Sequence, residues 1–394
     1  MQIVGVICEY NPFHTGHAWQ LAELRRRGAK AVVCCMGGNF TQRGDCAIVR
    51  KHIRAAAALQ GGADLVLELP LPWATASAEG FAQGGAAVLS ATGVVDTLAF
   101  GSECADTGRI VRAADALCAP DFASALKAEL EKGDAFAAAR QRAAARLLGA
   151  DAAILSNPND ILGVEYAKAL RGTTIAPLAL PRVGVSHGGG TAGGYASASH
   201  IRARLLQGED APCLTHGQYA LYEAERAAGR APVSFANLER AVLARLRSMD
   251  EADFAAYDEG NEGLYHRFYS AVRAGAAFDG VLSAAKTKRY AHARMRRLAL
   301  AAFLGITPEL RAGTVPYIRV LGMNGKGKSL LHGMRKTAEL PVVVKPADAR
   351  ALSPAARRLI ELEARATDLY ALAYPDLSQS VCGAEWRTNP VIIL

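Results

Sequence analysis

Residues 3–17 read IVGVICEYNPFHTGH, and this stretch decides how the rest of the chain is interpreted. IVGVIC is a near-continuous apolar run, which is typical of a strand buried on both faces of a parallel sheet. The Asn-Pro pair that follows ends the strand, and we expect a helix from about Thr15. His14 and His17 then share one face of the first helical turn, and Gly16 has no side chain to block an approaching ligand.

The start of this expected helix is suited to binding an anion. Its unpaired backbone N–H groups and its dipole point in one direction, so a triphosphate would meet donors from both the backbone and the imidazoles. The position also follows a parallel strand, and open α/β sheets bind ligands at the carboxyl ends of their strands. The alternative is that the two histidines only cap the helix, with no ligand.

The first part of the chain alternates apolar runs with alanine-rich helical patterns. Further strands are expected at 31–36, 64–69, 94–100 and 174–180, and helices at 16–28, 48–60 and 78–91. This alternation predicts right-handed βαβ units and an open parallel sheet. The fold class is therefore α/β, with a Rossmann-like domain that we expect to span residues 1–208.

The remainder, residues 209–394, is expected to form a mainly α-helical domain. Residues 209–312 have an almost continuous helical pattern, and 351–373 return to helix. Two short strand candidates, VPYIRVLGM and LPVVVK, lie within 313–345.

Composition excludes several classes of protein. The 394 residues include 45 Lys and Arg against 37 Asp and Glu, a formal charge of +8, and 51% are hydrophobic, which excludes intrinsic disorder. No apolar run approaches the roughly 20 residues of a membrane span, and the N-terminus lacks the features of a signal peptide. The eight cysteines contain no C-x-x-C pair, so no metal site is expected. We expect a cytoplasmic protein with no membrane contact and no evident stable protein partner.

A second segment resembles a known phosphate-binding signature. H-x-G-H after a first strand is similar to the nucleotidyltransferase superfamily that includes the adenylyltransferases and class I aminoacyl-tRNA synthetases. SASHIR at 197–202 resembles the later signature of that superfamily, S-S/T-x-I-R. The resemblance places Ser199 and Arg202 at phosphate contacts, and Ala198 departs from the usual hydroxyl residue.

Other segments narrow the resemblance to one family. They are GNFTQRGDCAIVRKHIRAAAALQGGADLVLELP (38–70), SAEGFAQGG (77–85), TLAFGSE (97–103), PNDILGVEYAKAL (158–170), LPRVG (180–184) and TKRYAHARMRR (287–297). Together they resemble the bacterial tRNA(Met) cytidine acetate ligases. The resemblance implies that ATP and acetate form acetyl-adenylate, and that the acetyl group then passes to N4 of the wobble cytidine of elongator tRNA(Met), with release of AMP and pyrophosphate. Mg²⁺ is expected to bridge the phosphates.

The resemblance also implies individual ATP-binding residues. They are Ile7, Cys8, Glu9, Tyr10, Asn11, Pro12, Phe13, His14, Thr15, Gly16, His17, Ala18, Trp19, Gln20, Gly101, Asn159 and Arg182, together with Ser199 and Arg202. Two positions depart from the family pattern: Asp160 stands where a second Asn is common, and Thr15 where Asn is frequent.

Three side chains are expected to carry the chemistry. Acetate is already ionised at neutral pH, so adenylation needs positioning and cancellation of negative charge rather than a strong base. His14 and His17 are suited to this task. Arg43, in the loop after the second strand, is expected to join them, the alternative being a loop-bracing arginine. For Arg182, the alternative to phosphate contact is a salt bridge.

A cluster of cations is expected to bind RNA. KTKRYAHARMRR at 286–297 contains Lys286, Lys288, Arg289, Arg294, Arg296 and Arg297 without one acidic residue. Such a cluster suits contact with a phosphate backbone. The alternative is a solvated helix face.

One further motif is rejected. GMNGKGKS at 322–329 matches the P-loop pattern G-x-x-x-x-G-K-S. Only 65 residues follow it, and no later strand ends in an Asp that could hold Mg²⁺. We expect an Asn-Gly turn whose basic residues face solvent or RNA.

Two other functions remain open at this point. One is a nucleotidyltransferase that joins ATP or CTP to a small phosphorylated metabolite, although the helical second part and the basic segment argue against it. The other is an RNA-binding protein with a vestigial nucleotide site, against which the intact H-x-G-H and SASHIR signatures argue.

Overall fold

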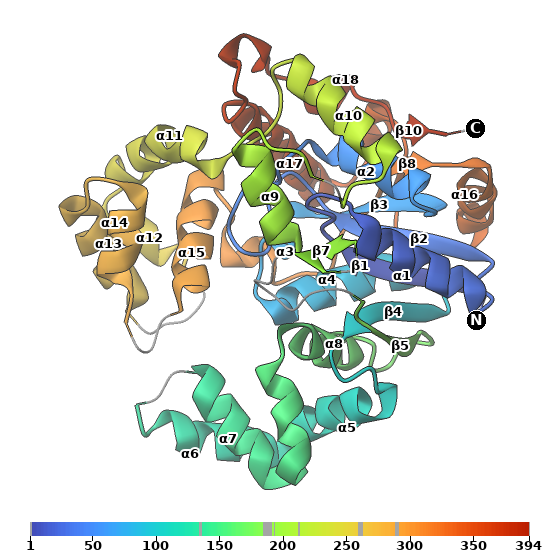
Figure 1. Cartoon of the computed structure of the whole chain (residues 1–394). Helices are drawn as coiled ribbons and strands as arrows, with labels where there is room; N and C mark the ends of the chain where they lie inside the picture. The colour runs from blue at the N-terminus through green and yellow to red at the C-terminus, as the bar shows by residue number, and fades with distance from the viewer. Residues whose placement is uncertain are drawn as a thin grey trace.

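The computed structural model of the chain describes residues 2–133, 136–183, 191–192, 194–211, 213–258, 263–287 and 291–393. Its centre is a mostly parallel sheet with helices on both faces (Figure 1). The strand order is β10-β8-β3-β2-β1-β4-β5, and β9 pairs with β8. The first five strands are β1 (Ile3–Cys8), β2 (Ala31–Gly37), β3 (Leu65–Leu69), β4 (Thr97–Ser102) and β5 (Ala176–Pro181).

These five strands confirm the predicted α/β fold. β1 pairs in parallel with β2 and β4, and the outer pairs β2–β3 and β4–β5 are also parallel. Every residue of β2 and β3 is buried, as the unbroken apolar runs require. A second, two-stranded sheet joins β6 (Thr191–Ala192) to β7 (Tyr195–Ala196).

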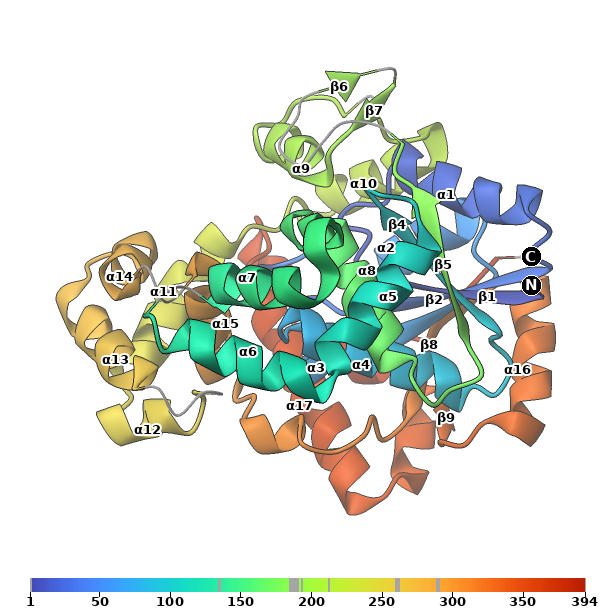
Figure 2. The ribbon, with the colours of Figure 1, turned by 90° about the horizontal axis from the view of Figure 1, so that it is seen from below.

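Along each strand, side chains point alternately to the two faces of the sheet, so a different set of helices packs on each face. Val32 and Cys34 of β2 pack with α1 (Thr15–Arg26) and α2 (Lys51–Gln60). Val33 and Cys35 pack with the helices on the opposite face, which Figure 2 shows in front of the sheet. That layer includes α3 (Leu71–Ala74), α4 (Ala78–Ala91), α5 (Thr107–Cys118), α8 (Pro158–Ala169) and α17 (Pro354–Ala371).

Two groups of helices extend beyond the sheet (Figure 1). The first, between β4 and β5, contains α6 (Pro120–Leu130), α7 (Phe136–Leu148) and the 3-10 helix at Gly149–Ser156. The second contains α11 (Phe235–Arg247), α12 (Glu251–Ala255), α13 (Leu264–Ala274), α14 (Phe278–Ala285) and α15 (His292–Leu304). Along the chain, α9 (Ala198–Leu206) and α10 (His216–Ala227) come after β7 and before this second group.

The C-terminal part of the chain returns to the sheet. β8 (Ile318–Met323) pairs antiparallel with β3, and β9 (Val342–Val343) and β10 (Val391–Ile392) pair in parallel with β8. The division of the chain at residue 208 stays a prediction from the sequence. The structure adds that strands from the second part complete the sheet of the first.

The segment that matches a P-loop is not a loop. α16 (Gly325–Thr337) starts at once after β8, and Asn324 caps it by accepting a hydrogen bond from the N–H of Gly327, 3.0 Å away. A Cβ atom on Gly327 would collide with the carbonyl of Asp64, so the first turn of α16 packs closely against the residue that precedes β3. The expected Asn-Gly turn is therefore wrong, although Lys326 and Lys328 are exposed as expected.

One class of segment is not found in the described part of the chain. None of its helices combines the length and the apolar character needed to cross a membrane.

Candidate active site

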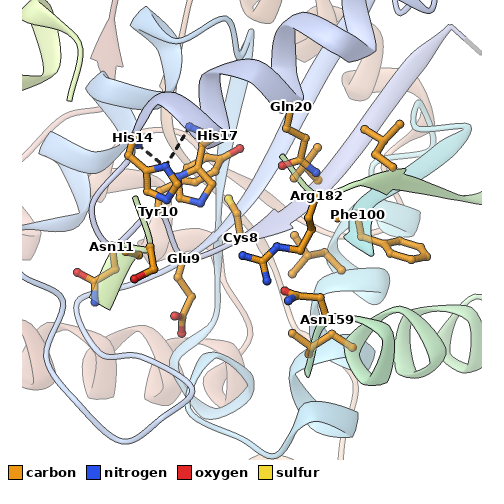
Figure 3. Close-up of a pocket in the computed structure, with 18 of the residues that line it drawn as sticks. Cys8, Glu9, Tyr10, Asn11, His14, His17, Gln20, Phe100, Asn159 and Arg182 are labelled. Atoms are coloured by element: carbon orange, nitrogen blue, oxygen red, sulfur yellow. Dashed lines mark hydrogen bonds between the residues drawn. The ribbon is translucent and has the colours of Figure 1, made fainter. Parts of the chain in front are cut away.

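A cavity of about 320 Å³ opens at the carboxyl ends of β1, β4 and β5 (Figure 3). The segment after β1, the start of α1, the loop after β2 and the start of α9 enclose it. This is the edge of a parallel sheet at which ligands usually bind. The sequence predicted the cavity at this place from the first strand and the helix after it.

The two histidines of this site are joined to each other and to the backbone. His14 is the N-cap of α1, and its Nδ1 accepts a hydrogen bond from the N–H of Gly16 at 3.0 Å. Nδ1 of His17 accepts from the N–H of His14 at 3.3 Å, and the two rings stack with centroids 3.8 Å apart. Because each Nδ1 is an acceptor, the proton of each neutral ring lies on Nε2. Both rings are therefore hydrogen-bond donors.

Neither ring carries a positive charge at neutral pH. Burial and the nearby Arg182 and Arg202 lower the pKa of His14 to about 4. Burial, with His14 and Arg182 as neighbours, lowers the pKa of His17 well below its usual value. Without a ligand, the imidazoles can donate hydrogen bonds from Nε2, and the positive charge at the cavity is that of the arginines.

Glycine at position 16 has a different role from the one expected. A Cβ atom there would lie 2.9 Å from Cε1 of His14, so a side chain would displace the imidazole ring. Gly16 therefore makes room for His14 rather than only for a ligand. Gly101 acts similarly, because a Cβ atom there would lie 3.3 Å from Cγ of Arg182.

Three arginines line the cavity: Arg43 from the loop after β2, Arg182 from the segment after β5 and Arg202 from α9. Nη1 of Arg202 donates a hydrogen bond to the carbonyl oxygen of Asn11 at 2.7 Å, and this bond orients the guanidinium beside the segment that leads into α1. Arg182 forms an ion pair with Glu103 at 3.3 Å. The structure shows the salt bridge of Arg182 and its place in the cavity lining, and phosphate contact by Arg182 stays a prediction.

Glu103 is a site neighbour that the sequence analysis missed. Its Oε1 accepts from Nδ2 of Asn159 at 2.6 Å as well as from Arg182, so it positions two candidate ATP contacts together. Glu103 lies two residues after Gly101 in AFGSE, and this proximity to a candidate ATP residue was the signal in the sequence that could have identified it.

The departure at Asp160 has a structural explanation. Its side chain is fully buried, and it accepts hydrogen bonds from Ser102 Oγ at 2.6 Å and Asn157 Nδ2 at 2.8 Å. It therefore braces the end of β4 against α8. Asn159 beside it lines the cavity, as its expected role requires.

Most of the candidate ATP residues lie around this one cavity. Those that line it are Ile7, Cys8, Glu9, Tyr10, Asn11, His14, Gly16, His17, Trp19, Gln20, Gly101, Asn159, Arg182 and Arg202, and Arg43 joins them.

The other candidates do not line the cavity. Phe13 is 1% exposed and packs in the core beneath α1, where Pro12 is also buried and Ala18 packs against the same cluster. Oγ1 of Thr15 donates to the carbonyl of Gly194 at 3.1 Å. These positions lie inside the contiguous stretch 7–20, but the turn into α1 points them away from the cavity.

Of the two serines near the start of α9, Ser197 rather than the candidate Ser199 lines the cavity. Ser197 is the N-cap of α9, where its Oγ accepts from the N–H of His200 at 3.2 Å, and it lines the cavity. The hydroxyl of Ser199, the second residue of α9, lies 3.1 Å from the hydroxyl of Ser197, and Ser199 does not line the cavity. Other lining residues outside the candidate set include Gln42, Phe100, Tyr166 and Tyr195.

The side chains of the basic segment at 286–297 are less exposed to solvent than the sequence indicated. Lys288 and Arg289 lie outside the described residues, and Lys286 is exposed. On α15, the guanidinium of Arg296 lies over the rings of Phe235 and Phe278, 5.3 and 5.9 Å from their centroids.

The other two arginines of α15 are also partly enclosed. Arg294 lies 3.6 Å from Asp258. Arg294 and Arg297 line a cavity of about 660 Å³ between this helix and α4, α6 and α8. A uniformly solvated helix face is therefore excluded for these two residues.

Metal-ligating residues do not gather in the part of the chain that the structure covers. Within it, no group of three or more His, Cys, Asp or Glu side chains is placed to hold a metal ion. All eight cysteines are free, as expected for a chain without a C-x-x-C pair.

Comparisons with known proteins assign the chain to a family. The sequence model of the HIGH Nucleotidyl Transferase family matches residues 1–383. The tRNA(Met) cytidine acetate ligase of Acetivibrio thermocellus is 36% identical over the whole of both chains. The chain belongs to the tRNA(Met) cytidine acetate ligase family. A second member of this ligase family, from Caldanaerobacter subterraneus, is 36% identical over 96% of this chain and 97% of its own.

Solved structures of the same ligase family agree with this fold. Thermotoga maritima TmcAL without ligand has a TM-score of 0.95 and 32% identity, with complete coverage of both chains. A structure of the same protein bound with alpha-thio ATP has a TM-score of 0.93 and covers 100% of this chain and 99% of that one. The predicted nucleotidyltransferase fold and family are confirmed.

Proposed function

We propose that this protein is an ATP-dependent ligase that acetylates N4 of the wobble cytidine of elongator tRNA(Met), using acetate and releasing AMP and pyrophosphate. Relatives that match the whole chain are tRNA(Met) cytidine acetate ligases. The observation that carries the proposal is the cavity at the start of α1, where two imidazole donors and three arginines converge. A full-length structural neighbour binds alpha-thio ATP.

In the first step, acetate attacks the α-phosphorus of ATP and pyrophosphate leaves. The Nε2–H groups of His14 and His17 would donate to phosphate oxygens, and Arg43, Arg182 and Arg202 would offset the negative charge. The start of α1 adds its dipole. Catalysis here depends on placing reactants and stabilising charge, and no protein side chain has to accept a proton.

Binding of ATP also implies a rearrangement at Arg182. Its guanidinium contacts Glu103 in this structure, at 34% exposure, and a phosphate would compete for it. Asn159 shares the same carboxylate, so we propose that Glu103 holds both residues near their ATP-bound positions.

Mg²⁺ is proposed to be held by the phosphate oxygens of ATP rather than by a protein cage. The described residues provide no cluster of metal-ligating side chains, so the donor set does not fit a resident metal. Mg²⁺ usually retains several waters and binds through substrate phosphates.

We propose that residues 1–208 bind ATP and that the helices within 209–394 supply the tRNA surface. The candidate RNA contacts are Lys286, Lys288, Arg289, Arg294, Arg296 and Arg297, of which Arg296 is already engaged by two aromatic rings. Since tRNA and ATP are cytoplasmic molecules, the cytoplasm is the proposed location.

The proposal is tested by incubating purified protein with ATP, [¹⁴C]acetate and transcribed elongator tRNA(Met), and counting label in precipitated RNA. Label should depend on ATP and be lost when the wobble cytidine is replaced by uridine. Label-free RNA, together with a nucleotide joined to a small phosphorylated acceptor, would instead identify a metabolite nucleotidyltransferase.

A further inference from the structure

The active-site cavity has one carboxylate among its described lining residues, that of Glu9. Its Oε1 accepts a hydrogen bond from the N–H of Gln42 at 2.7 Å, and its carbonyl accepts from Nη1 of Arg54 at 2.6 Å. These two bonds fix both the backbone and the side chain. Figure 3 shows the carboxylate pointing away from His14 and His17.

Apart from the phenol of Tyr195, the other titratable groups that line the cavity are unsuited to accepting a proton. Both histidines use Nδ1 as an acceptor from the backbone and carry their proton on Nε2. Burial, with the nearby Cys34, raises the pKa of the thiol of Cys8 and of the phenol of Tyr10 well above their usual values. Burial also raises the pKa of Tyr166. Arg43, Arg182 and Arg202 are cations.

The second step of the proposed reaction requires a proton acceptor, whereas the first does not. When N4 of cytosine attacks the acetyl carbonyl, a C–N bond forms and the C–O bond to AMP breaks, with the electron pair leaving on AMP. The amino group changes from NH₂ to NH, so one proton has to leave N4. The lone pair of this amine is delocalised into the ring, and removal of the proton in the transition state assists the attack.

Glu9 also lies on the side of the cavity that faces the helical part of the chain. The loop that contacts it through Gln42 continues to Gly44, where a Cβ atom would lie 2.8–3.0 Å from the backbone of Arg296 on α15. Next to this contact is a second cavity of about 250 Å³, lined by Asp45, Phe235, Phe278 and Arg296. Arg202 lines both cavities, so they adjoin. A nucleotide that approaches from α15 would reach Glu9 through this loop.

We propose that the carboxylate of Glu9 is the general base that takes the proton from N4 of the incoming cytidine as the acetyl group is transferred. The inference rests on the proposed function and deepens it, because it assigns Glu9 to acetyl transfer. The resemblance to the ligase family placed Glu9 among the ATP contacts. A carboxylate repels phosphate oxygens, whereas no such repulsion opposes its contact with the neutral amine of cytosine.

The test separates the two half-reactions in Glu9→Gln. The amide oxygen of Gln can still accept the hydrogen bond from Gln42, but it is not a base. Hydroxylamine, a strong nucleophile, traps acetyl-adenylate as acetohydroxamate without needing a protein base. We expect Glu9→Gln to lose about 30-fold or more of single-turnover acetyl transfer to saturating tRNA beyond any loss of hydroxamate formation from ATP and acetate. Glu9→Asp, which keeps a carboxylate, should transfer faster than Glu9→Gln.

Two results would overturn the inference. Wild-type acetyl transfer by Glu9→Gln would show that no base is supplied at this position, and an equal loss of hydroxamate formation and transfer would place Glu9 in ATP binding. Failure of the proposed function looks different, because then the wild-type protein itself would form neither hydroxamate nor acetylated tRNA.

Discussion

At the scale of single residues, His14 and His17 show how backbone geometry changes the role of a motif. The sequence predicted that both rings would lie at one helix start, and they do. It left helix capping by both histidines open as an alternative, and the structure shows that each ring does accept a backbone hydrogen bond there, which depends on dihedral angles that spacing does not reveal. The consequence is that the rings are neutral donors and also stabilise α1.

This double role separates two substitutions of His14. His14→Asn keeps a residue that caps helices well but removes the Nε2–H donor, so we expect at least a 10-fold loss of acetate-dependent ATP–pyrophosphate exchange with little change in melting temperature. His14→Ala should lose the same activity and about 1 kcal/mol of stability as well. Exchange assays and thermal unfolding measure both effects. Wild-type exchange in His14→Asn would remove the donor role.

Arg182 and Lys328 distinguish the two phosphate-like motifs of the chain. Arg182 lines the cavity, whereas Lys328 lies exposed on a helix with no loop before it. Arg182→Ala should weaken ATP binding by about 1.5–3 kcal/mol, the loss of one charge-assisted hydrogen bond, and Lys328→Ala should leave ATP affinity nearly unchanged. Calorimetric titration decides the matter. Lost binding in Lys328→Ala with normal binding in Arg182→Ala would contradict the assignment.

At the scale of elements, the sequence predicted which segments form strands and helices more reliably than the residues at which they begin. Apolar runs located β1 to β5, but the helix expected at 48–60 begins only at Lys51. The N–H of Ile48 is taken by Oδ1 of Asn11, so this residue belongs to the loop that holds the active-site segment in place. A side chain 37 positions away decides that boundary, and local patterns do not contain it.

Helix α15 is the element whose role in RNA binding is most open to test. Charge reversal at Arg294, Arg296 and Arg297 should weaken tRNA binding and flatten its dependence on salt, because fewer counterions are released. Hydroxamate formation without tRNA should persist in Arg294→Glu/Arg297→Glu, because these two residues line the cavity of about 660 Å³ rather than the active-site cavity.

The matched control for α15 is Arg171→Glu, at an exposed arginine after α8 that pairs with Asp115. It makes a charge change of the same kind at a site outside the three cavities. Filter binding at several salt concentrations compares the variants. If the triple variant binds tRNA as the wild type does at low salt, α15 has no part in RNA contact.

At the scale of the whole molecule, a buried ionic cluster ties the C-terminal part to the sheet. Nζ of Lys51 lies 2.7 Å from Glu68 and 2.5 Å from Glu385, and Nε of Arg319 lies 3.5 Å from Glu68. Glu363 joins through Tyr317, whose hydroxyl donates to it at 2.7 Å. The cluster connects α2, β3, β8, α17 and α18 (Ala384–Arg387). The paired residues lie from 17 positions apart, for Lys51 and Glu68, to 334 apart, for Lys51 and Glu385, so a local sequence pattern does not predict their burial.

The cluster predicts an unusual pH dependence of stability. Burial and the neighbouring Glu68 raise the pKa of Glu363 from 4.5 to about 7. Between these values the folded chain holds a proton that the unfolded chain releases, so the stability from this group is complete below about pH 4.5 and is lost as pH rises to about 7. The loss amounts to about 3 kcal/mol.

Glu363→Gln should abolish this slope, because an amide does not titrate. The difference in melting temperature between Glu363→Gln and wild type should therefore increase from about pH 5 to pH 8. Taking this difference removes the contributions of the buried histidines, because both proteins contain them. Glu361→Gln, at an exposed position of the same helix, is the control and should show no such trend. A constant difference between Glu363→Gln and wild type across this range would mean that Glu363 is ionised in the folded protein.

The central claim is that the protein places acetate on one cytidine of a tRNA with ATP as the energy source. It is tested most directly by liquid chromatography and mass spectrometry of nucleosides, after elongator tRNA(Met) has been incubated with the protein, ATP and ¹³C-labelled acetate. We predict one new nucleoside, N4-acetylcytidine carrying the label, which is absent without ATP and absent when the wobble cytidine is changed to uridine. Unmodified cytidine in the complete reaction, with protein shown to bind both ATP and tRNA, would contradict the account.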